Sequence, residues 1–117
     1  MSLHIKRVYE PAETTDGQRI LVDRIWPRGL TKEKAAVDTW MKTVAPTTEL
    51  RKWFNHDPAR WAEFRARYAR ELDANPEAVK QVRDLIKTGK TTLLFAAHDP
   101  VHNNAVAIAD YLDGKLS

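Results

Sequence analysis

The stretch Ile20-Leu21-Val22-Asp23-Arg24-Ile25-Trp26-Pro27-Arg28-Gly29-Leu30 decides how this chain folds. Its first half is rich in aliphatic and β-branched residues, which predicts a buried, central strand over residues 19–25. Charged residues, a tryptophan, a proline and a glycine follow directly. In open α/β sheets, ligands bind outside the carboxyl ends of the strands. The stretch therefore predicts a strand that delivers charged side chains to a binding edge.

Length and composition limit the class of protein. The chain has 117 residues, of which 43% are hydrophobic and 30% are charged, which predicts one globular domain over residues 1–117. It contains no cysteine, and this excludes disulfides, thiolate metal ligands and a thiol nucleophile. Its apolar stretches are too short to cross a membrane, and the amino terminus does not resemble a signal peptide. We therefore expect a cytoplasmic protein with no membrane partner.

Three more segments are predicted as strands. Alternating apolar and basic residues indicate a strand over residues 3–9, and the aliphatic run at residues 91–97 is the clearest strand in the chain. Residues 37–43 fit either a helical face or one side of a strand. We favour the strand because Thr39 and Val44 are weak helix formers.

Capping signals divide the rest of the chain into helices. Thr31 is expected to cap a short helix over residues 32–35, and Thr47 or Thr48 starts a helical turn that runs to residue 54. Each of Asp57-Pro58, Asn75-Pro76 and Asp99-Pro100 places a proline at the start of a further helix. Strands that alternate with helices predict an α/β fold: a compact layered domain with a small, mainly parallel, Rossmann-like sheet flanked by helices.

The first candidate site follows the strand over residues 19–25. Arg24 and Arg28 carry guanidinium groups of the kind that bind phosphate or carboxylate in a bidentate manner. Trp26 is predicted to stack on a ligand ring or to pack in the core. Asp23 is predicted to orient an arginine or to act as a base, and the alternative is a purely structural Asp–Arg pair.

The second candidate site follows the strand over residues 91–97. His98 and His102 are candidate acid/base groups, since histidine as a residue type can transfer protons near neutral pH, while Asp99 is predicted to cap the last helix. Asn103 is expected in the first helical turn, where free N–H groups favour an anion. The alternative interpretation is a capping motif with incidental polar residues. His56 precedes a similar Asp-Pro pair and has a weaker claim to the site.

The histidines and aspartates match no compact metal-ligand spacing, so we expect no metal site. The chain has no glycine-rich phosphate loop, and its motifs do not identify a cofactor.

Several motifs together are similar to those of one family. They are Asp16 to Leu30, Leu50 to Phe54, His56 to Pro58, Arg60-Trp61, Phe64, Tyr68, Leu93 to Asp99, and His102 to Asn104. Over nearly the whole chain they resemble the DUF488 family, in its short YeaO-like branch. The resemblance implies a compact α/β domain in a bacterial cytoplasm. It does not imply a reaction, because the function of this family is not established.

The resemblance also implies which site residues match those of longer family members. Arg24, Pro27, Arg28 and His102 match by position. Longer members carry a Cys-His-Arg motif where this chain has Val101-His102-Asn103. Any thiol chemistry of those members therefore does not transfer to this chain.

These patterns lead to one preferred function and two alternatives. We expect a domain that binds or acts on a small anionic or nucleotide-like ligand, without a decision between enzyme and binding protein. One alternative is a nucleic-acid-binding module that uses Arg24, Arg28, Lys32 and Lys34, which the modest net charge of +3 disfavours. The other is a regulatory interaction domain without chemistry. The sequence carries no information on oligomeric state.

Overall fold

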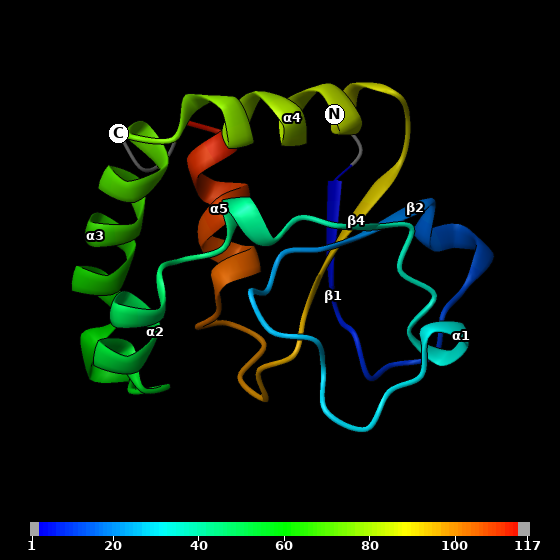
Figure 1. The fold of residues 1–117 in the computed structure, drawn as a ribbon, viewed down its shortest axis with the longest axis horizontal. Helices are drawn as coiled ribbons and strands as arrows, with labels where there is room; N and C mark the ends of the chain where they lie inside the picture. The colour runs from blue at the N-terminus through cyan, green and yellow to red at the C-terminus, as the bar shows by residue number, and fades with distance from the viewer. Residues whose placement is uncertain (1–2, 115–117) are drawn as a thin grey trace.

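The computed structural model describes residues 3–114 of the chain. Within that range the chain forms one four-stranded sheet with helices packed against it (Figure 1). The strands are β1 (Leu3–Arg7), β2 (Gln18–Leu21), β3 (Thr39–Trp40) and β4 (Thr91–Phe95). The helices are α1 (Lys32–Ala35), α2 (Thr48–Phe54), α3 (Trp61–Asp73), α4 (Pro76–Lys87) and α5 (Asn104–Leu112), with 3₁₀ turns at Thr14–Asp16, Lys42–Val44 and Pro58–Arg60.

All strand pairs in this sheet are parallel, and the strand order is β1-β4-β2-β3. Both β2 and β4 therefore have neighbours on each side, which confirms the prediction that the aliphatic stretch at residues 19–25 contains a central strand. Parallel strands place all their carboxyl ends at one edge. The layered α/β fold predicted from the sequence is confirmed.

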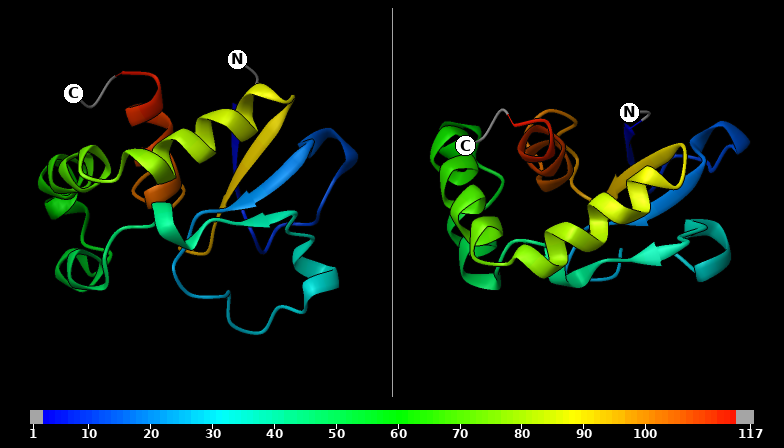
Figure 2. Two further views of the ribbon diagram at one scale, coloured as in Figure 1. Left: turned by 45° about the horizontal axis from the view of Figure 1, so that its top comes forward. Right: turned by 90° about the horizontal axis from the view of Figure 1, so that it is seen from above.

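The two faces of the sheet are covered differently. Ile20, Val22, Leu93 and Phe95 belong to the larger core, which is completed by residues of α2 to α5. Figures 1 and 2 show α5 between α3 and the sheet. The alternate residues, including Leu21 and Leu94, belong to a smaller core that the segment with α1 covers. The alternation of strand side chains thus explains both layers, although most of the helices pack on one face.

Several predicted boundaries are wrong by a few residues. β1 ends at Arg7 rather than at residue 9, and β2 ends at Leu21 because the chain turns away toward the site after Val22. Of residues 37–43, only Thr39 and Trp40 form a strand, and a 3₁₀ turn follows at Lys42–Val44. The predicted caps at Thr31 and Thr47 are confirmed, since each hydroxyl accepts a backbone N–H of its helix.

The start of the last helix was also predicted wrongly. We expected Asp99-Pro100 to open it, but α5 begins at Asn104, and Val101 before it is 57% exposed. The physical reason is local. The Asp99 carboxylate accepts the N–H groups of Val101 and His102 in a turn, and Asn103 takes the cap position by accepting the N–H of Val106. His102 and Asn103 therefore precede the helix rather than lie in its first turn.

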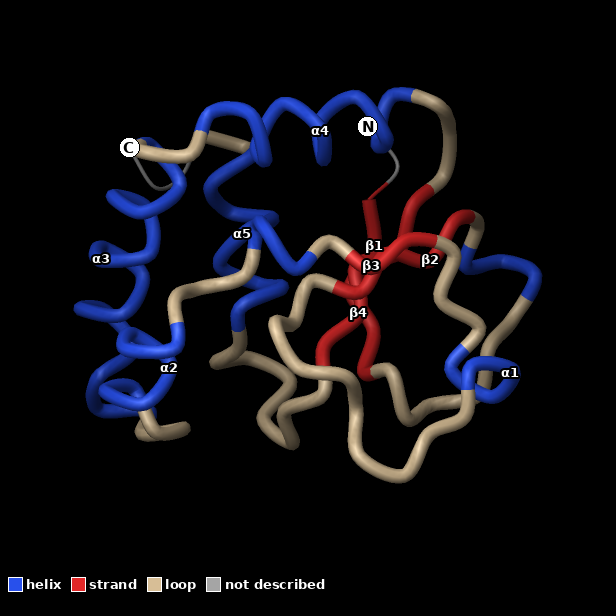
Figure 3. Tube along the Cα trace, in the orientation of Figure 1, coloured by secondary structure: helices blue, strands red, loops and turns tan. Residues whose placement is uncertain are grey.

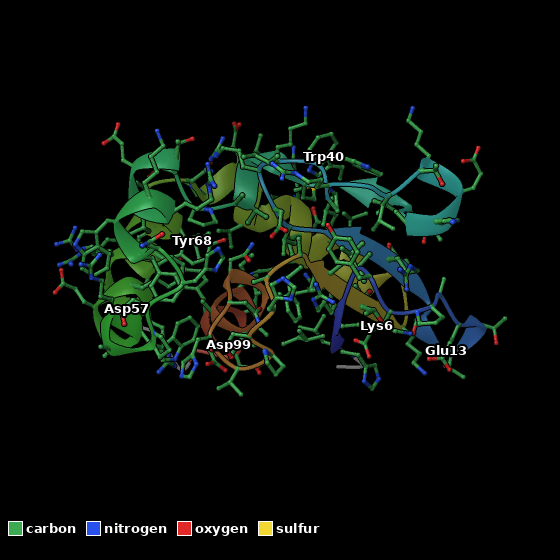
Figure 4. All side chains as sticks on the ribbon, turned by 90° about the horizontal axis from the view of Figure 1, so that it is seen from below. Lys6, Glu13, Trp40, Asp57, Tyr68 and Asp99 are labelled. Carbon is green, nitrogen blue, oxygen red and sulfur yellow. The ribbon has the colours of Figure 1, made fainter. Side chains whose placement is uncertain are left out.

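A buried ionic cluster closes the amino-terminal edge of the sheet. The guanidinium of Arg19, a residue only 3% exposed, pairs with Asp16 and donates to the carbonyl oxygens of Ala35 and Ala36. Lys6 adds ion pairs to Asp16 at 3.2 Å and to Glu13 at 2.9 Å. Figure 4 shows Lys6 and Glu13 together, at the opposite end of the molecule from Asp57. This cluster ties β1, β2 and α1 together away from the carboxyl edge.

Gly17 directly precedes β2 at this edge of the sheet. Its backbone conformation requires glycine, with φ at 66° and ψ at −143°. A Cβ atom there would lie 2.3 Å from the carbonyl oxygen of Lys90. Gly17→Ala is therefore expected to destabilise the fold by more than the roughly 1–3 kcal/mol that such a backbone conformation alone costs. Gly29→Ala is the matched control, since Gly29 also has a positive φ of 81° but open space around its Cβ position. Urea unfolding of both variants measures the difference, and equal losses would contradict the steric argument.

Candidate functional site

The carboxyl ends of β1, β2 and β4 surround one cavity. Figure 3 shows the loops that follow β1 and β4 gathered at one edge of the sheet, away from α4. The cavity has a volume of about 300 Å³, within the range of small-molecule sites. Its lining comes from Tyr9, from the stretch 23–28, from α2 and the turn after it, and from residues 96–104. The two motifs singled out in the sequence therefore form walls of the same cavity.

Asp23 is the carboxylate of this cavity. One carboxylate oxygen accepts the N–H of Ala96 at 2.9 Å, and the other accepts an amide N–H of Asn104 at 2.9 Å. Burial is the main influence on this carboxyl and raises its pKa, while these two hydrogen bonds and the charges of Arg51 and His56 act in the opposite direction. Asp23 thus joins the ends of β2 and β4 to α5 and keeps lone pairs available to the cavity.

Arg24 lines the cavity, but its guanidinium is largely engaged by the protein. Its Nε donates to the carbonyl oxygen of Pro46 and its Nη2 to that of Ala45, both at 3.1 Å. These bonds hold the chain between β3 and α2 against the end of β2. Because Arg24 turns inward, it does not join Lys32 and Lys34 of α1 in the basic stripe that a nucleic-acid-binding module would need.

Three other basic side chains line the cavity without a protein partner. Arg28, Arg51 and His56 are exposed, and within residues 3–114 their side chains make no hydrogen bond or ion pair. Arg51 lies on α2, and His56 follows it in a left-handed turn in which Asn55 and His56 have φ values of 48° and 54°. Arg28 and Arg51 therefore bring positive charge to the cavity, and His56 adds an imidazole ring. Of the three, only Arg28 was predicted as a ligand-binding residue.

His102 is held by Asp99. The His102 Nδ1 lies 2.7 Å from a carboxylate oxygen of Asp99, and the imidazole ring meets the Trp61 ring edge-on at 5.3 Å. Because Nδ1 contacts Asp99, Nε2 is the ring nitrogen that stays available to a ligand in the cavity, which His102 lines. Hydrogen bonds from the backbone N–H of Val101 and from His102 lower the pKa of Asp99 to about 2. The carboxylate therefore stays ionised and fixes the orientation of the ring.

The lowered pKa of Asp99 has a consequence for stability. A carboxyl whose pKa is lower in the folded state stabilises the fold above its unfolded pKa, and that contribution is lost as pH falls through the folded value. We expect part of the acid destabilisation between about pH 4 and pH 2 to come from Asp99. Asp99→Asn should flatten the stability profile in that window, as measured by urea unfolding at each pH. An unchanged profile would contradict the geometry of this turn.

Asn103 and Asn104 have different roles. Asn103 is 2% exposed, and its side chain accepts the N–H of Val106 and donates to the carbonyl oxygen of Asp99. Although Asn103 lines the cavity, its amide is engaged in capping α5. Asn104 donates to Asp23 and to the carbonyl oxygen of Val22. Asn104 was missed by sequence reasoning, although its place beside the predicted Asn103 was the available signal.

Aromatic and proline side chains supply most of the remaining lining. Trp26 donates its indole N–H to the carbonyl oxygen of Leu30 and packs edge-on against Trp40 at 5.3 Å, so its ring is fixed where it lines the cavity. Phe54 and Phe64 are buried at the back. These flat apolar surfaces suit a planar ligand.

His98, a predicted acid/base residue, does not line this cavity. Its ring nitrogen Nδ1 lies 3.2 Å from Arg7 Nη2, and the side chain is exposed. The structure therefore brings together Asp23, Arg24, Trp26, Arg28, His102 and Asn103, and leaves His98 outside. Residues 3–114 contain no group of three metal-ligating side chains placed to hold an ion. Within the same range, no helix is long and apolar enough to span a membrane.

The fold and the cavity define a class of protein. It is a small parallel α/β domain with a largely apolar pocket at the carboxyl ends of its strands, and exposed basic side chains line that pocket. The chain belongs to the DUF488 group, because a family model described as "Inactive DUF488-N3 subclade" matches residues 2–117. It is 45% identical over 112 residues to the uncharacterized protein YeaO of Escherichia coli, covering 96% of this chain and 97% of that one.

Relatives in mycobacteria are similar over the same length. The chain is 40% identical over 113 residues to the uncharacterized proteins Mb3100c of Mycobacterium bovis and Rv3073c of Mycobacterium tuberculosis, covering 97% of this chain and 95% of each relative. No solved structure matched the chain. The family resemblance seen in the sequence motifs is thus confirmed over the whole chain.

Proposed function

We propose that this protein binds a small anionic molecule in the cavity at the carboxyl ends of β1, β2 and β4. The observation that carries the proposal is the set of three basic side chains, Arg28, Arg51 and His56, that line one cavity without a protein partner. Unpaired arginines beside a concave apolar pocket are typical of sites for phosphate or carboxylate groups.

Binding without turnover is the form of this function that we favour. The description of the matching family model names an inactive subclade, and the chain has no cysteine to act as a thiol nucleophile. His102 then serves as a hydrogen-bonding group for the ligand, with its orientation set by Asp99.

Phenyl phosphate is a suitable test molecule, since it joins a flat apolar ring to an anion, and phenol is its uncharged control. In calorimetric titration at low salt we expect phenyl phosphate to bind at least about tenfold more tightly than phenol, because a charge-assisted hydrogen bond contributes about 1.5–3 kcal/mol. Equal binding of the two compounds, or no binding of phenyl phosphate at millimolar concentration, would overturn the proposal.

Acid/base catalysis is the second candidate, and it rests on the contact of 2.7 Å between His102 and Asp99. This geometry fixes the imidazole tautomer and offers Nε2 to a bound molecule, with Asp23 as a second ionisable group in the cavity. Release of phenol from phenyl phosphate, measured by absorbance, tests it. If no phenol is released, or if the wild type and His102→Gln release it at the same rate, binding without catalysis remains the proposed function.

A further inference from the structure

The carboxylate of Asp23 faces the cavity without a positively charged partner. Within residues 3–114, no lysine, arginine or histidine nitrogen lies within 4.0 Å of its oxygens. Its two protein contacts are N–H groups of Ala96 and Asn104, one on each oxygen. A carboxylate has about four acceptor positions. Two of these are therefore left for a ligand that donates hydrogen bonds.

Asn104 adds a second acceptor beside this carboxylate. Both of its amide N–H groups are used, one by the carbonyl oxygen of Val22 at 2.7 Å and one by Asp23 at 2.9 Å. Since a carbonyl oxygen can only accept, the contact with Val22 fixes which end of the amide is nitrogen. The Asn104 Oδ1 has no hydrogen-bond partner within the described residues, and Asn104 lines the cavity.

Acceptor groups and positive charges therefore line the same cavity. Asp23 and Asn104 sit where the ends of β2 and β4 meet the start of α5, and they offer only acceptors to a ligand. Arg28 and Arg51 are exposed and offer only positive charge and N–H donors. Trp26 and Tyr9 also line the cavity. A molecule that satisfies both kinds of group must carry N–H donors as well as an anion.

From this arrangement we infer that the cavity recognises a planar group with two neighbouring N–H donors through Asp23 and Asn104, in a molecule whose anionic group lies at Arg28 and Arg51. The inference rests on the proposed function and names its ligand class. Two sources carry the shared chemistry. A guanine nucleotide presents the N1–H and the 2-amino group of its base, and a guanidino acid presents its guanidinium.

The experiment compares ligands that differ in the proposed N–H donors. Guanosine monophosphate is titrated against inosine monophosphate, which keeps the N1–H but lacks the 2-amino group, and 4-guanidinobutanoate is titrated against pentanoate, which has no guanidinium. The presence of an N–H donor to a carboxylate is expected to strengthen ligand binding about 10- to 100-fold. A preference of that size in the first comparison assigns the ligand to the nucleotides, and one confined to the second comparison assigns it to the guanidino acids. Either preference supports the inference.

A variant then locates the preference at the carboxylate. Asp23→Asn is expected to abolish it, because the amide replaces one carboxylate acceptor by an N–H donor. The matched control is Asp110→Asn, because Asp110 lies on α5, pairs with Arg65 and does not line the cavity. It should keep the preference in full.

The results distinguish a failure of the donor-pair inference from a failure of the proposed anion site. If phenyl phosphate binds but neither comparison shows a preference, the donor-pair inference is overturned and the proposed anion site stands. If phenyl phosphate also fails to bind, both the donor-pair inference and the proposed anion site are overturned. The comparison on the wild-type protein decides these outcomes even if Asp23→Asn does not fold, since Asp23 joins β2, β4 and α5.

Discussion

Replacing Arg28 and Arg51 together by alanine will weaken the binding of phenyl phosphate by about 100-fold. Neither guanidinium has a protein partner within residues 3–114, so each is free for the anion. Hydrogen bonds to charged groups contribute about 1.5–3 kcal/mol each, and a loss of roughly 3 kcal/mol in total corresponds to that factor. The folded state should lose little stability, because neither side chain makes a hydrogen bond or ion pair within residues 3–114.

The control for this prediction removes the same charge elsewhere. Arg70 and Lys87 are exposed and lie outside the cavity, on α3 and α4. The variant with Arg70→Ala and Lys87→Ala has the same net charge as the test variant, so it separates local contacts from general attraction. Calorimetric titration should show near wild-type affinity for the control. Equal weakening in the two variants would mean that the arginines do not hold the anion.

Arg19→Ala is expected to destabilise the fold more than the other single substitutions considered above, by about 3–5 kcal/mol, the usual cost of removing one partner of a buried ion pair. Arg19 is 3% exposed, pairs with Asp16 and satisfies the carbonyl oxygens of Ala35 and Ala36. The variant would leave these carbonyl groups without their side-chain donor and Asp16 with only Lys6 as its cation. Since domains of this size are stable by roughly 5–15 kcal/mol, a large share of the total would be lost.

Arg83→Ala provides the comparison, because Arg83 is exposed and makes one long hydrogen bond of 3.3 Å to the carbonyl oxygen of Leu112. Its loss should stay below about 1 kcal/mol. Urea unfolding at neutral pH measures both variants. A similar small loss for Arg19→Ala would contradict the structural role of the ionic cluster at the amino-terminal edge.

The sequence predicted the sheet well, because long aliphatic runs have few alternatives to a buried strand. It predicted strand ends and the start of the last helix less well. Asp99-Pro100 carries the same capping signal as Asp57-Pro58, but Asp99 binds the N–H groups of Val101 and His102, and Asn103 caps α5 instead. Hydrophobic periodicity does not show which of several neighbouring polar side chains will cap a helix.

The site was predicted in part for a similar reason. Asp23, Arg28 and His102 follow strands directly, and the carboxyl edge of a parallel sheet brings such residues together. Arg51 reaches the cavity from α2, and only tertiary packing places that helix beside β2. Arg24 was predicted to face a ligand, yet it donates to the carbonyl oxygens of Ala45 and Pro46. The orientation of Arg24 depends on residues 21 and 22 positions away in the chain, which local sequence patterns do not encode.

The central claim is that an anionic ligand with paired N–H donors occupies the cavity at the carboxyl ends of β1, β2 and β4. NMR titrations of the ¹⁵N-labelled protein with guanosine monophosphate and with 4-guanidinobutanoate, one ligand from each source, test it most directly. We predict that the Ala96 amide, the Asn104 side-chain amide and the Trp26 indole N–H shift together with one dissociation constant. Shifts confined to the opposite edge, around Asp16 and Lys90, or no shifts with either ligand at millimolar concentration, would contradict it.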